Sequence, residues 1–259
     1  MPPLLHFQRV TVLRGGRPAL REIDLRIEAG EHVALLGPNG SGKSSLIKAI
    51  TRELYPLRQP GSSLSILGRE LWDVFELRGQ LGIVTPDLLA HAPDGVTALD
   101  AVLSGFFSSD GVWWDRQAVT PAMRHRAQAA LTGMNALTLA DRLVHELSSG
   151  ELRRIQLVRA LVHEPLALVL DEPSTHLDLS AQAELRSHLR ALAQASTGII
   201  LVTHHLADII PEIERVILLG AGRIVGDGPK ATMLEPARLA SLFGVPVEIS
   251  RRDGYYHGW

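Results

Sequence analysis

The stretch Gly37-Pro38-Asn39-Gly40-Ser41-Gly42-Lys43-Ser44 decides the fold of this 259-residue chain. It fits the pattern G-x-x-x-x-G-K-[ST], in which a glycine-rich loop holds phosphate groups. The pattern needs a strand before the loop and a helix after it. A short apolar strand is predicted at 32–36 and helix-favouring residues fill 43–50, so both neighbours are present. The sequence therefore predicts a strand, loop and helix that bind a polyphosphate.

Each residue type in this loop has a physical reason. Glycines let the backbone curl, so that successive N–H groups and the start of the following helix face the phosphates. We expect the Lys43 ammonium to reach the β- and γ-phosphates and the Ser44 hydroxyl to ligate Mg²⁺. The alternative is a glycine-rich turn that only caps a helix. The predicted nucleotide-binding residues here are Gly37, Pro38, Asn39, Gly40, Ser41, Gly42, Lys43, Ser44 and Ser45.

Strands and helices alternate along the rest of the chain. Residues 4–27 alternate apolar and polar side chains around Gly15-Gly16, which predicts two antiparallel strands joined by a turn. Residues 87–164 are expected to be mostly helical, with a loop at 106–115, and residues 250–259 are expected to fray. Residues 56–66 are expected to form a loop that runs into a strand. Further strands are predicted at 81–84, 166–170, 198–203 and 216–219, a helix at 180–194 and a short helix at 206–214. This order predicts an α/β core with a parallel sheet.

Composition excludes several classes of protein. Apolar residues make up 46% and charged residues 21%, which is typical of a globular chain. The formal net charge of −2 gives no bulk attraction to nucleic acid or to an anionic membrane. The chain has no cysteine, which excludes disulfides and thiol nucleophiles. The apolar runs are far shorter than the roughly 20 residues that span a bilayer. We expect a cytoplasmic chain without a targeting segment.

Two carboxylates, Asp171 and Glu172, follow the predicted strand at 166–170. Doubly wound sheets form their sites at the carboxyl ends of the strands. We expect Asp171 to hold Mg²⁺, directly or through water, and Glu172 to polarise an attacking water. Acidic residues also end strands as caps of the next helix. The pair alone leaves both interpretations open.

Three further motifs follow in a fixed order and point to a family. They are Leu147-Ser148-Ser149-Gly150-Glu151 before a helix-favouring run, Ser174-Thr175-His176-Leu177-Asp178 after the acidic pair, and Thr203-His204-His205 after the next strand. Together with the phosphate loop and the acidic pair, they resemble the motifs of the nucleotide-binding subunit of ABC ATPases. The new motifs are similar to its signature sequence, its D-loop and its switch histidine. The resemblance covers residues 4–247.

The resemblance implies a fold, an activity and an assembly. The fold is a RecA-like core with a mostly parallel sheet, an N-terminal antiparallel β-layer and a helical sub-domain at 87–163, within a single cassette of residues 1–259. The activity is hydrolysis of ATP, with Mg²⁺, by the motor subunit of a transporter whose membrane subunits are separate chains. The chain would then lie on the inner face of the membrane. Two cassettes would enclose two ATP molecules head to tail, and no nucleic-acid partner is expected.

The resemblance also assigns roles to single residues. Ser149 and Gly150 of one subunit would meet the γ-phosphate held by Lys43 of the other. A serine hydroxyl and N–H groups that open a helix form an anion site. His204 would contact the γ-phosphate and help to hold the water beside Glu172. The implied catalytic residues are therefore Glu172, His204 and Lys43.

Two positions depart from the family pattern. Arg14 stands where the family carries an aromatic residue that stacks on adenine. A guanidinium plane can also stack on a base, although an exposed arginine in a turn is the alternative. Pro86 stands where the family has a glutamine that touches Mg²⁺. Either Asp87 replaces that ligand, beside Ser44 and Asp171, or Asp87 caps the first helix of the sub-domain.

Other assignments have alternatives of equal standing. Asp178 would communicate across the dimer, or it caps the following helix. Phe106-Phe107 and Trp113-Trp114 precede the signature, where a membrane subunit would dock, or they are buried in the core. The alternative function is a soluble ABC ATPase in translation, repair or regulation. A single cassette without a long charged insertion favours the transporter, whereas the missing glutamine counts against it.

Overall fold

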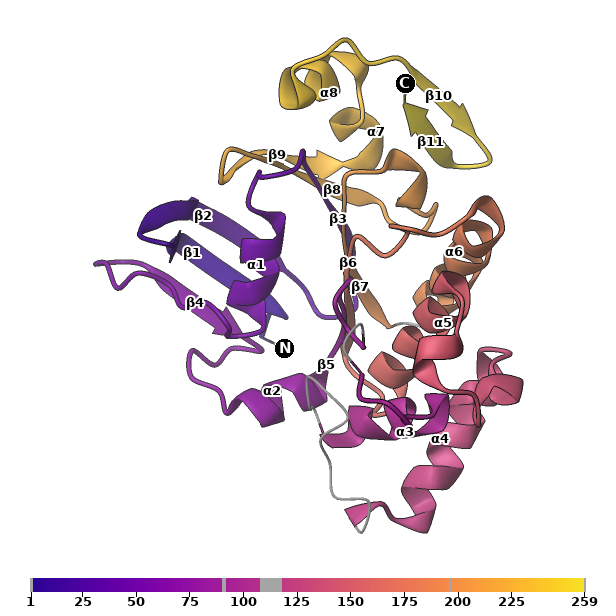
Figure 1. The fold of residues 1–259 in the computed structure, drawn as a ribbon. Helices are drawn as coiled ribbons and strands as arrows, with labels where there is room; N and C mark the ends of the chain where they lie inside the picture. The colour runs from indigo at the N-terminus through magenta and orange to yellow at the C-terminus, as the bar shows by residue number, and fades with distance from the viewer. Residues whose placement is uncertain (1, 90–91, 108–117, 196, 259) are drawn as a thin grey trace. The chain divides into compact units, whose positions relative to one another are not determined.

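The structure is a computed structural model that describes residues 2–89, 92–107, 118–195 and 197–258. The chain divides into two compact units (Figure 1). The first consists of Met1–Val74 together with Ala193–Trp259, and the second of Phe75–Leu192. The two units are described in turn.

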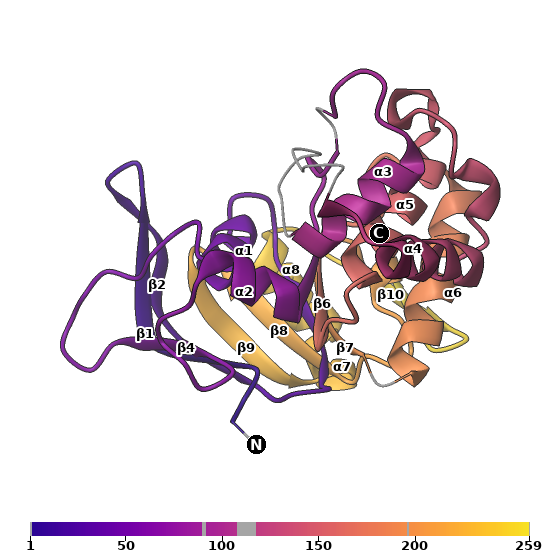
Figure 2. The same ribbon diagram turned by 90° about the horizontal axis from the view of Figure 1, so that it is seen from below.

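An antiparallel β-layer opens the first unit. β1 (Leu5–Arg14) pairs with β2 (Arg17–Ile27) across the Gly15-Gly16 turn and with β4 (Ser63–Ile66) on its other side. Figure 2 shows the three strands side by side. The apolar residues of the layer are buried, among them Phe7 and Ile23. The antiparallel strands predicted from the alternation at 4–27 are confirmed.

The main sheet of the first unit carries the phosphate-binding loop. Its strands β7 (Gly198–Thr203), β3 (His32–Leu36), β8 (Arg215–Gly220) and β9 (Arg223–Pro229) lie in that order. β3 is parallel to β7 and β8, whereas β9 returns antiparallel to β8. Every residue of β7 is buried, as expected for a parallel strand covered on both faces. α1 (Lys43–Ile50) follows β3 as predicted.

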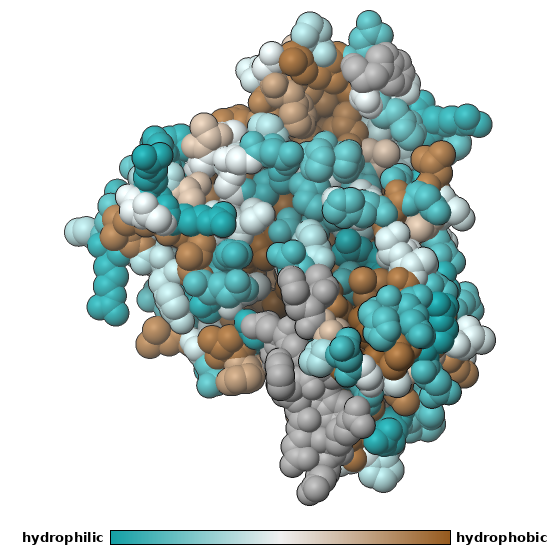
Figure 3. Space-filling view, viewed as in Figure 1, coloured by the Kyte–Doolittle hydropathy of each residue, from teal (hydrophilic) through white to brown (hydrophobic). Residues whose placement is uncertain are grey.

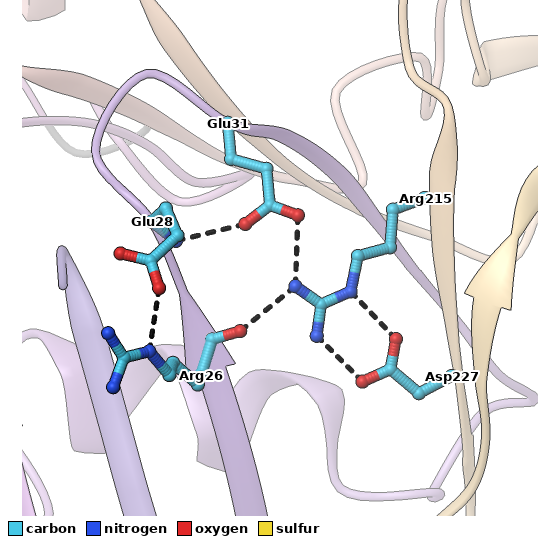
Figure 4. A network of polar contacts seen from close by, with 5 residues as sticks. All are labelled: Arg26, Glu28, Glu31, Arg215 and Asp227. Atoms are coloured by element: carbon cyan, nitrogen blue, oxygen red, sulfur yellow. Dashed lines mark hydrogen bonds and ion pairs between the residues drawn. The ribbon is translucent and has the colours of Figure 1, made fainter.

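One arginine joins three strands of this unit. The Arg215 guanidinium donates to both carboxylate oxygens of Asp227, each at 2.7 Å, and Nη1 donates to Glu31 Oε1 and to the Arg26 carbonyl oxygen, each at 2.9 Å (Figure 4). The hydrogen bonds to Asp227 raise the pKa of Arg215 above its ordinary value. The network fixes the start of β3 against the β8–β9 hairpin, at the opposite end of β3 from the loop.

The last part of the first unit differs from expectation. Two short helices, α7 (Lys230–Met233) and α8 (Pro236–Phe243), precede a hairpin of β10 (Ile249–Arg252) and β11 (Tyr255–Gly258). The predicted fraying at 250–259 is therefore wrong over the described residues. Asp253-Gly254, both at positive φ, form the kind of turn that joins two strands directly.

The predicted short helix at 206–214 is also largely wrong. Only one 3-10 turn forms there, η5 (Leu206–Asp208). Pro211 explains the difference, because a proline disfavours helical backbone in the residue before it.

The second unit packs helices on two parallel strands, β5 (Leu81–Val84) and β6 (Ala167–Asp171). A Cβ at Gly82 would lie 2.5 Å from the carbonyl oxygen of Ala160, so this glycine permits the close approach of α5 to β5. The described part of 87–164 is mostly helical, as predicted. The helices and turns are α2 (Val74–Gln80), α3 (Ala98–Leu103), η1 (Ser104–Phe107), α4 (Pro121–Gly133), η3 (Leu137–Leu139), η4 (Val144–Glu146), α5 (Ser149–Leu161) and α6 (Leu179–Gln194).

The aromatic pairs predicted for docking have different outcomes. Trp113 and Trp114 lie outside the described residues. Phe106 and Phe107 are half-buried on η1, and the Arg126 guanidinium lies 5.5 Å from the centre of the Phe106 ring. Within the described part of the chain, no helix is both long and apolar enough to cross a membrane.

Candidate functional site

The glycine-rich loop joins β3 to α1, and its glycines have different tasks. Gly40 and Gly42 have φ of +78° and +110°, a backbone region that glycine enters at little cost. A Cβ at Gly37 would lie 2.3 Å from the Leu219 carbonyl oxygen, and one at Gly42 would lie 2.8 Å from that of Ala19. Gly37 and Gly42 therefore let the loop rest directly on the backbone of β8 and β2.

The loop carries two sources of positive charge, the Lys43 ammonium and the N-terminus of α1. Lys43 is 6% exposed, and its Nζ donates to the carbonyl oxygens of Gly37 at 2.7 Å and Pro38 at 3.1 Å. The first N–H groups of a helix lack partners within the helix, and no described side chain caps α1 at Gly42. Ser44 is exposed and Ser45 is buried on the first turn. The ammonium and the helix N-terminus together make an anion site.

A residue that the sequence analysis missed supports the loop. Gly222, in the β8–β9 turn, has φ of +76°, and a Cβ there would lie 2.7 Å from the Ala19 carbonyl oxygen. The Gly222 N–H donates to the Ser41 carbonyl oxygen, and the Gly222 carbonyl accepts from the Arg21 N–H, both at 2.8 Å. The only signal in the sequence is a glycine between two strands, which by itself predicts no more than a turn.

The acidic pair stands at the end of β6, in the second unit. Asp171 is buried at 8% exposure and Glu172 is half-buried. Glu172 has φ of +46°, a region that residues with side chains enter at an energetic cost. The next helix, α6, begins only at Leu179, so the interpretation of this pair as helix caps is wrong.

Asp178 does cap that helix. Its Oδ1 accepts from the Ala181 N–H at 2.8 Å, in the first turn of α6. Of the two roles considered for Asp178, helix capping is therefore present. A role in communication across a dimer stays a prediction.

The signature segment opens α5 through a reciprocal cap. Ser148 Oγ accepts from the Glu151 N–H at 3.3 Å, and Glu151 Oε2 accepts from the Ser148 N–H at 2.8 Å. Arg142 adds an ion pair to Glu151 Oε1 at 2.6 Å. The hydrogen bond from the Ser148 backbone is the main cause that lowers the pKa of the Glu151 carboxyl, and Arg142 lowers it further.

The two predicted signature residues, Ser149 and Gly150, lie in the first turn of α5, next to this cap. Ser149 is exposed, with Ser148 taking the capping role beside it. A Cβ at Gly150 would lie 2.9 Å from the Ala181 Cβ, so Gly150 lets α5 begin against the first turn of α6.

His204 follows β7 in the first unit. It is half-buried, and its ring centre lies 3.9 Å from that of the exposed His205, at 40° between the planes. Arg14, also in the first unit, is exposed at the end of β1. His204 thus directly follows the strand next to the one that leads into the loop, because β7 pairs with β3.

Asp87 is exposed in the turn after β5. The first helix after it, α3, is capped by Thr97, whose hydroxyl accepts from the Asp100 N–H at 3.1 Å. The alternative role of Asp87 as the cap of that helix is therefore wrong.

Known proteins resemble this chain over nearly its whole length. The family model described as ABC transporter matches residues 20–175. The uncharacterized ABC transporter ATP-binding protein YlmA of Bacillus subtilis is 30% identical over 95% of this chain and 93% of its own. The hemin import ATP-binding protein HmuV of Photobacterium damsela subsp. piscicida is 31% identical over 91% of this chain and 87% of its own.

A solved structure agrees with these sequence relatives. It is the dimeric post-hydrolysis state of the ATP-binding cassette MJ0796 bound to ADP and Pi. Its TM-score is 0.72 at 25% identity, and the match covers 87% of this chain and 98% of that one. The predicted RecA-like fold, with its mostly parallel sheet and antiparallel β-layer, is confirmed.

Proposed function

Because this chain belongs to the ABC transporter family as an ATP-binding and ATP-hydrolysing subunit, we propose a role in that reaction for each candidate residue. The observation that carries the proposal is the position of Lys43, whose ammonium lies over the loop carbonyls at the N-terminus of α1. Residues 37–45 would hold the phosphates of ATP. Lys43 would exchange its contacts with Gly37 and Pro38 for β- and γ-phosphate oxygens. Arg14 would stack on adenine.

Mg²⁺ is the cofactor we propose. The Ser44 hydroxyl and the Asp171 carboxylate are hard oxygen donors of the kind that Mg²⁺ prefers. Mg²⁺ usually binds one or two protein oxygens and takes its other ligands from water and substrate phosphates. Asp87 would supply a further carboxylate. When bound, Mg²⁺ neutralises charge on the phosphates.

Glu172 would act as the general base that orients and polarises the attacking water. Its strained backbone supports this role, because strain of this kind gathers at active sites. Lys43 and His204 would contact the γ-phosphate, whose negative charge they would help to stabilise in the transition state.

A second copy of the chain would complete each site. Ser149 and Gly150 open α5, where a hydroxyl and helix N–H groups would bind the γ-phosphate held by the other subunit. The exposure of Ser149 supports this arrangement, as does the dimeric form of the similar cassette MJ0796. In this scheme the chain is one cassette with a helical sub-domain at 87–163, and Asp178 would communicate across the dimer.

The remaining partners are membrane subunits encoded as separate chains. The chain would therefore work in the cytoplasm, on the inner face of the membrane. The similar protein HmuV is named for import of hemin, which favours import as the direction here. Co-expression with a multi-span membrane protein encoded beside this gene, followed by purification in detergent, tests the pairing. If the two chains fail to co-purify, the soluble regulatory role gains support.

The central experiment separates binding of ATP from its hydrolysis. Glu172→Gln should bind ATP normally and hydrolyse it at least roughly 100-fold more slowly, within the range for loss of general-base assistance. Lys43→Ala should lose binding instead. Binding is measured with a fluorescent ATP analogue, and turnover by phosphate release. Wild-type turnover in Glu172→Gln would refute the assignment of the base.

A further inference from the structure

Three hydrogen bonds close a ring around the backbone of His204. Thr203 Oγ1 donates to Asp208 Oδ2 at 2.8 Å. The same hydroxyl oxygen accepts from the His205 N–H at 3.0 Å, and the Asp208 N–H donates to the His205 carbonyl oxygen at 3.2 Å. We name these contacts the Thr203–Asp208 ring. The ring fixes the chain immediately before and after His204.

The Thr203–Asp208 ring is shielded from water. Thr203 is 0% exposed and Asp208 is 4% exposed. The Thr203 hydroxyl donates its one proton to the Asp208 carboxylate and accepts a hydrogen bond from the His205 N–H, so it acts as both donor and acceptor. A hydrogen bond to a charged group is stronger than a neutral one, and removal of a partner in a buried site leaves desolvation uncompensated. The turn that carries His204 is therefore held firmly.

Beyond the ring, the same turn borders a hollow. A space of about 330 Å³ is lined by His204, His205 and His257, and by apolar residues of α8 and of the segment after it. Figure 3 shows apolar surface gathered at the top of the view, where Figure 1 labels α8. The imidazole that lines this hollow is thus carried by the turn that the Thr203–Asp208 ring holds.

We propose that Thr203 and Asp208 are positioning residues for His204. The Thr203–Asp208 ring sets the position and direction of the imidazole, so that the imidazole is already oriented to contact the γ-phosphate. This inference rests on the role of His204 proposed above. Neither residue needs to touch ATP, because both act through the backbone that carries His204.

The test removes the hydroxyl while keeping the shape of the side chain. Thr203→Val should lower kcat by on the order of 10- to 100-fold, the cost of a small misplacement in an active site. The KM for ATP should stay at its wild-type value, since binding depends on the loop at 37–45. Thr203→Ser restores the hydroxyl and should restore kcat. Asp208→Asn keeps an acceptor oxygen, and its kcat should fall between those of the wild type and Thr203→Val.

The matched control makes the same change, threonine to valine, at a position outside the Thr203–Asp208 ring. Thr11 lies in β1, is 9% exposed, and its hydroxyl accepts from the Glu22 N–H at 3.2 Å. Thr11→Val should lower thermal stability and leave kcat unchanged. An effect of Thr11→Val on kcat equal to that of Thr203→Val would overturn the proposal.

A double-mutant cycle shows whether Thr203 acts through His204. In a His204→Ala background, Thr203→Val should cause no further loss of kcat. An equal further loss would overturn the inference while leaving the role of His204 intact. Full turnover in His204→Ala alone would instead remove the proposed role of His204, and the inference with it.

A second readout does not depend on turnover. In the nucleotide-free protein, the imidazole proton signals of His204 should shift in the NMR spectrum of Thr203→Val and return in Thr203→Ser. Unchanged signals in a folded Thr203→Val protein would overturn the proposal. If Thr203→Val does not fold, the same comparison with Asp208→Asn decides it.

Discussion

The backbone N–H of Gly222 donates a 2.8 Å hydrogen bond to the carbonyl oxygen of Ser41, in the middle of the phosphate-binding loop. Gly222 in turn accepts from the Arg21 N–H, so β2, the β8–β9 turn and the loop are joined through backbone atoms alone. The geometry of the loop therefore depends on a glycine far from it in the sequence.

Gly222→Ala should weaken ATP binding, by on the order of 10-fold if the loop is displaced even slightly. The new Cβ would lie 2.7 Å from the Ala19 carbonyl oxygen. Gly30→Ala is the matched control, because Gly30 has φ of +78° and open space around it. Both variants carry the roughly 1–2 kcal/mol cost of a side chain at positive φ. Titration with a fluorescent ATP analogue compares them, and equal affinities would exclude a supporting role for Gly222.

The cap of α5 should make stability depend on pH. Because the folded protein lowers the pKa of Glu151, its contribution is present above the unfolded pKa of about 4.3 and is lost as pH falls through the lower folded pKa. Glu151→Ala should cost about 1 kcal/mol at neutral pH, as loss of a cap does. Glu151→Gln keeps an acceptor for the Ser148 N–H and should cost less. Urea unfolding between pH 3 and 7 measures both, and a wild-type profile in Glu151→Ala would contradict the prediction.

Dimer formation should depend on the exposed start of α5. In the Glu172→Gln background, ATP should produce a dimer by light scattering, and Ser149→Arg should abolish it by placing a bulky charge in the anion site. Ser187→Arg, on an exposed position of α6, is the control and should dimerise. If Glu172→Gln stays monomeric at high concentration with ATP, the site is completed by a different cassette.

Asp87→Ala should raise the Mg²⁺ concentration that gives half-maximal ATPase. Because Thr97 caps α3, we expect no loss of thermal stability in this variant. Asp94→Ala removes another exposed carboxylate from the same unit and should leave the magnesium titration unchanged. Pro86→Gln supplies the ligand of the family pattern and should be tolerated. An unchanged half-saturation in Asp87→Ala would leave Asp87 without a role at the metal.

The parallel strands were predictable because their signal is local. β3, β6 and β7 each contain a run of at least four consecutive apolar residues, and burial on both faces is the environment that such runs need. β9 was not predicted, because Gly226, Gly228 and Pro229 break any strand pattern. It forms a strand because the turn at Gly222 brings it back alongside β8.

The same distinction holds for the candidate site. The residues of the loop, the acidic pair and His204 stand out because each motif is contiguous in the sequence. Gly222 and Asp208 do not, since what they support is set by contacts that form only in the folded chain. For Asp87, the choice between two roles depended on where α3 begins, and helix boundaries are the least certain part of a sequence-based prediction.

The C-terminal hairpin has a consequence for local unfolding. An isolated two-stranded hairpin is only marginally stable in water, so β10 and β11 keep their form by packing on the η5 turn, where Gly258 meets Leu206, and on Pro211 beside Gly254. Segments held by the same contacts open together. The amide protons of Tyr255–Gly258 should therefore exchange with solvent at the rate at which the turn after β7 opens. Their exchange rate measures the local stability of the segment that carries His204.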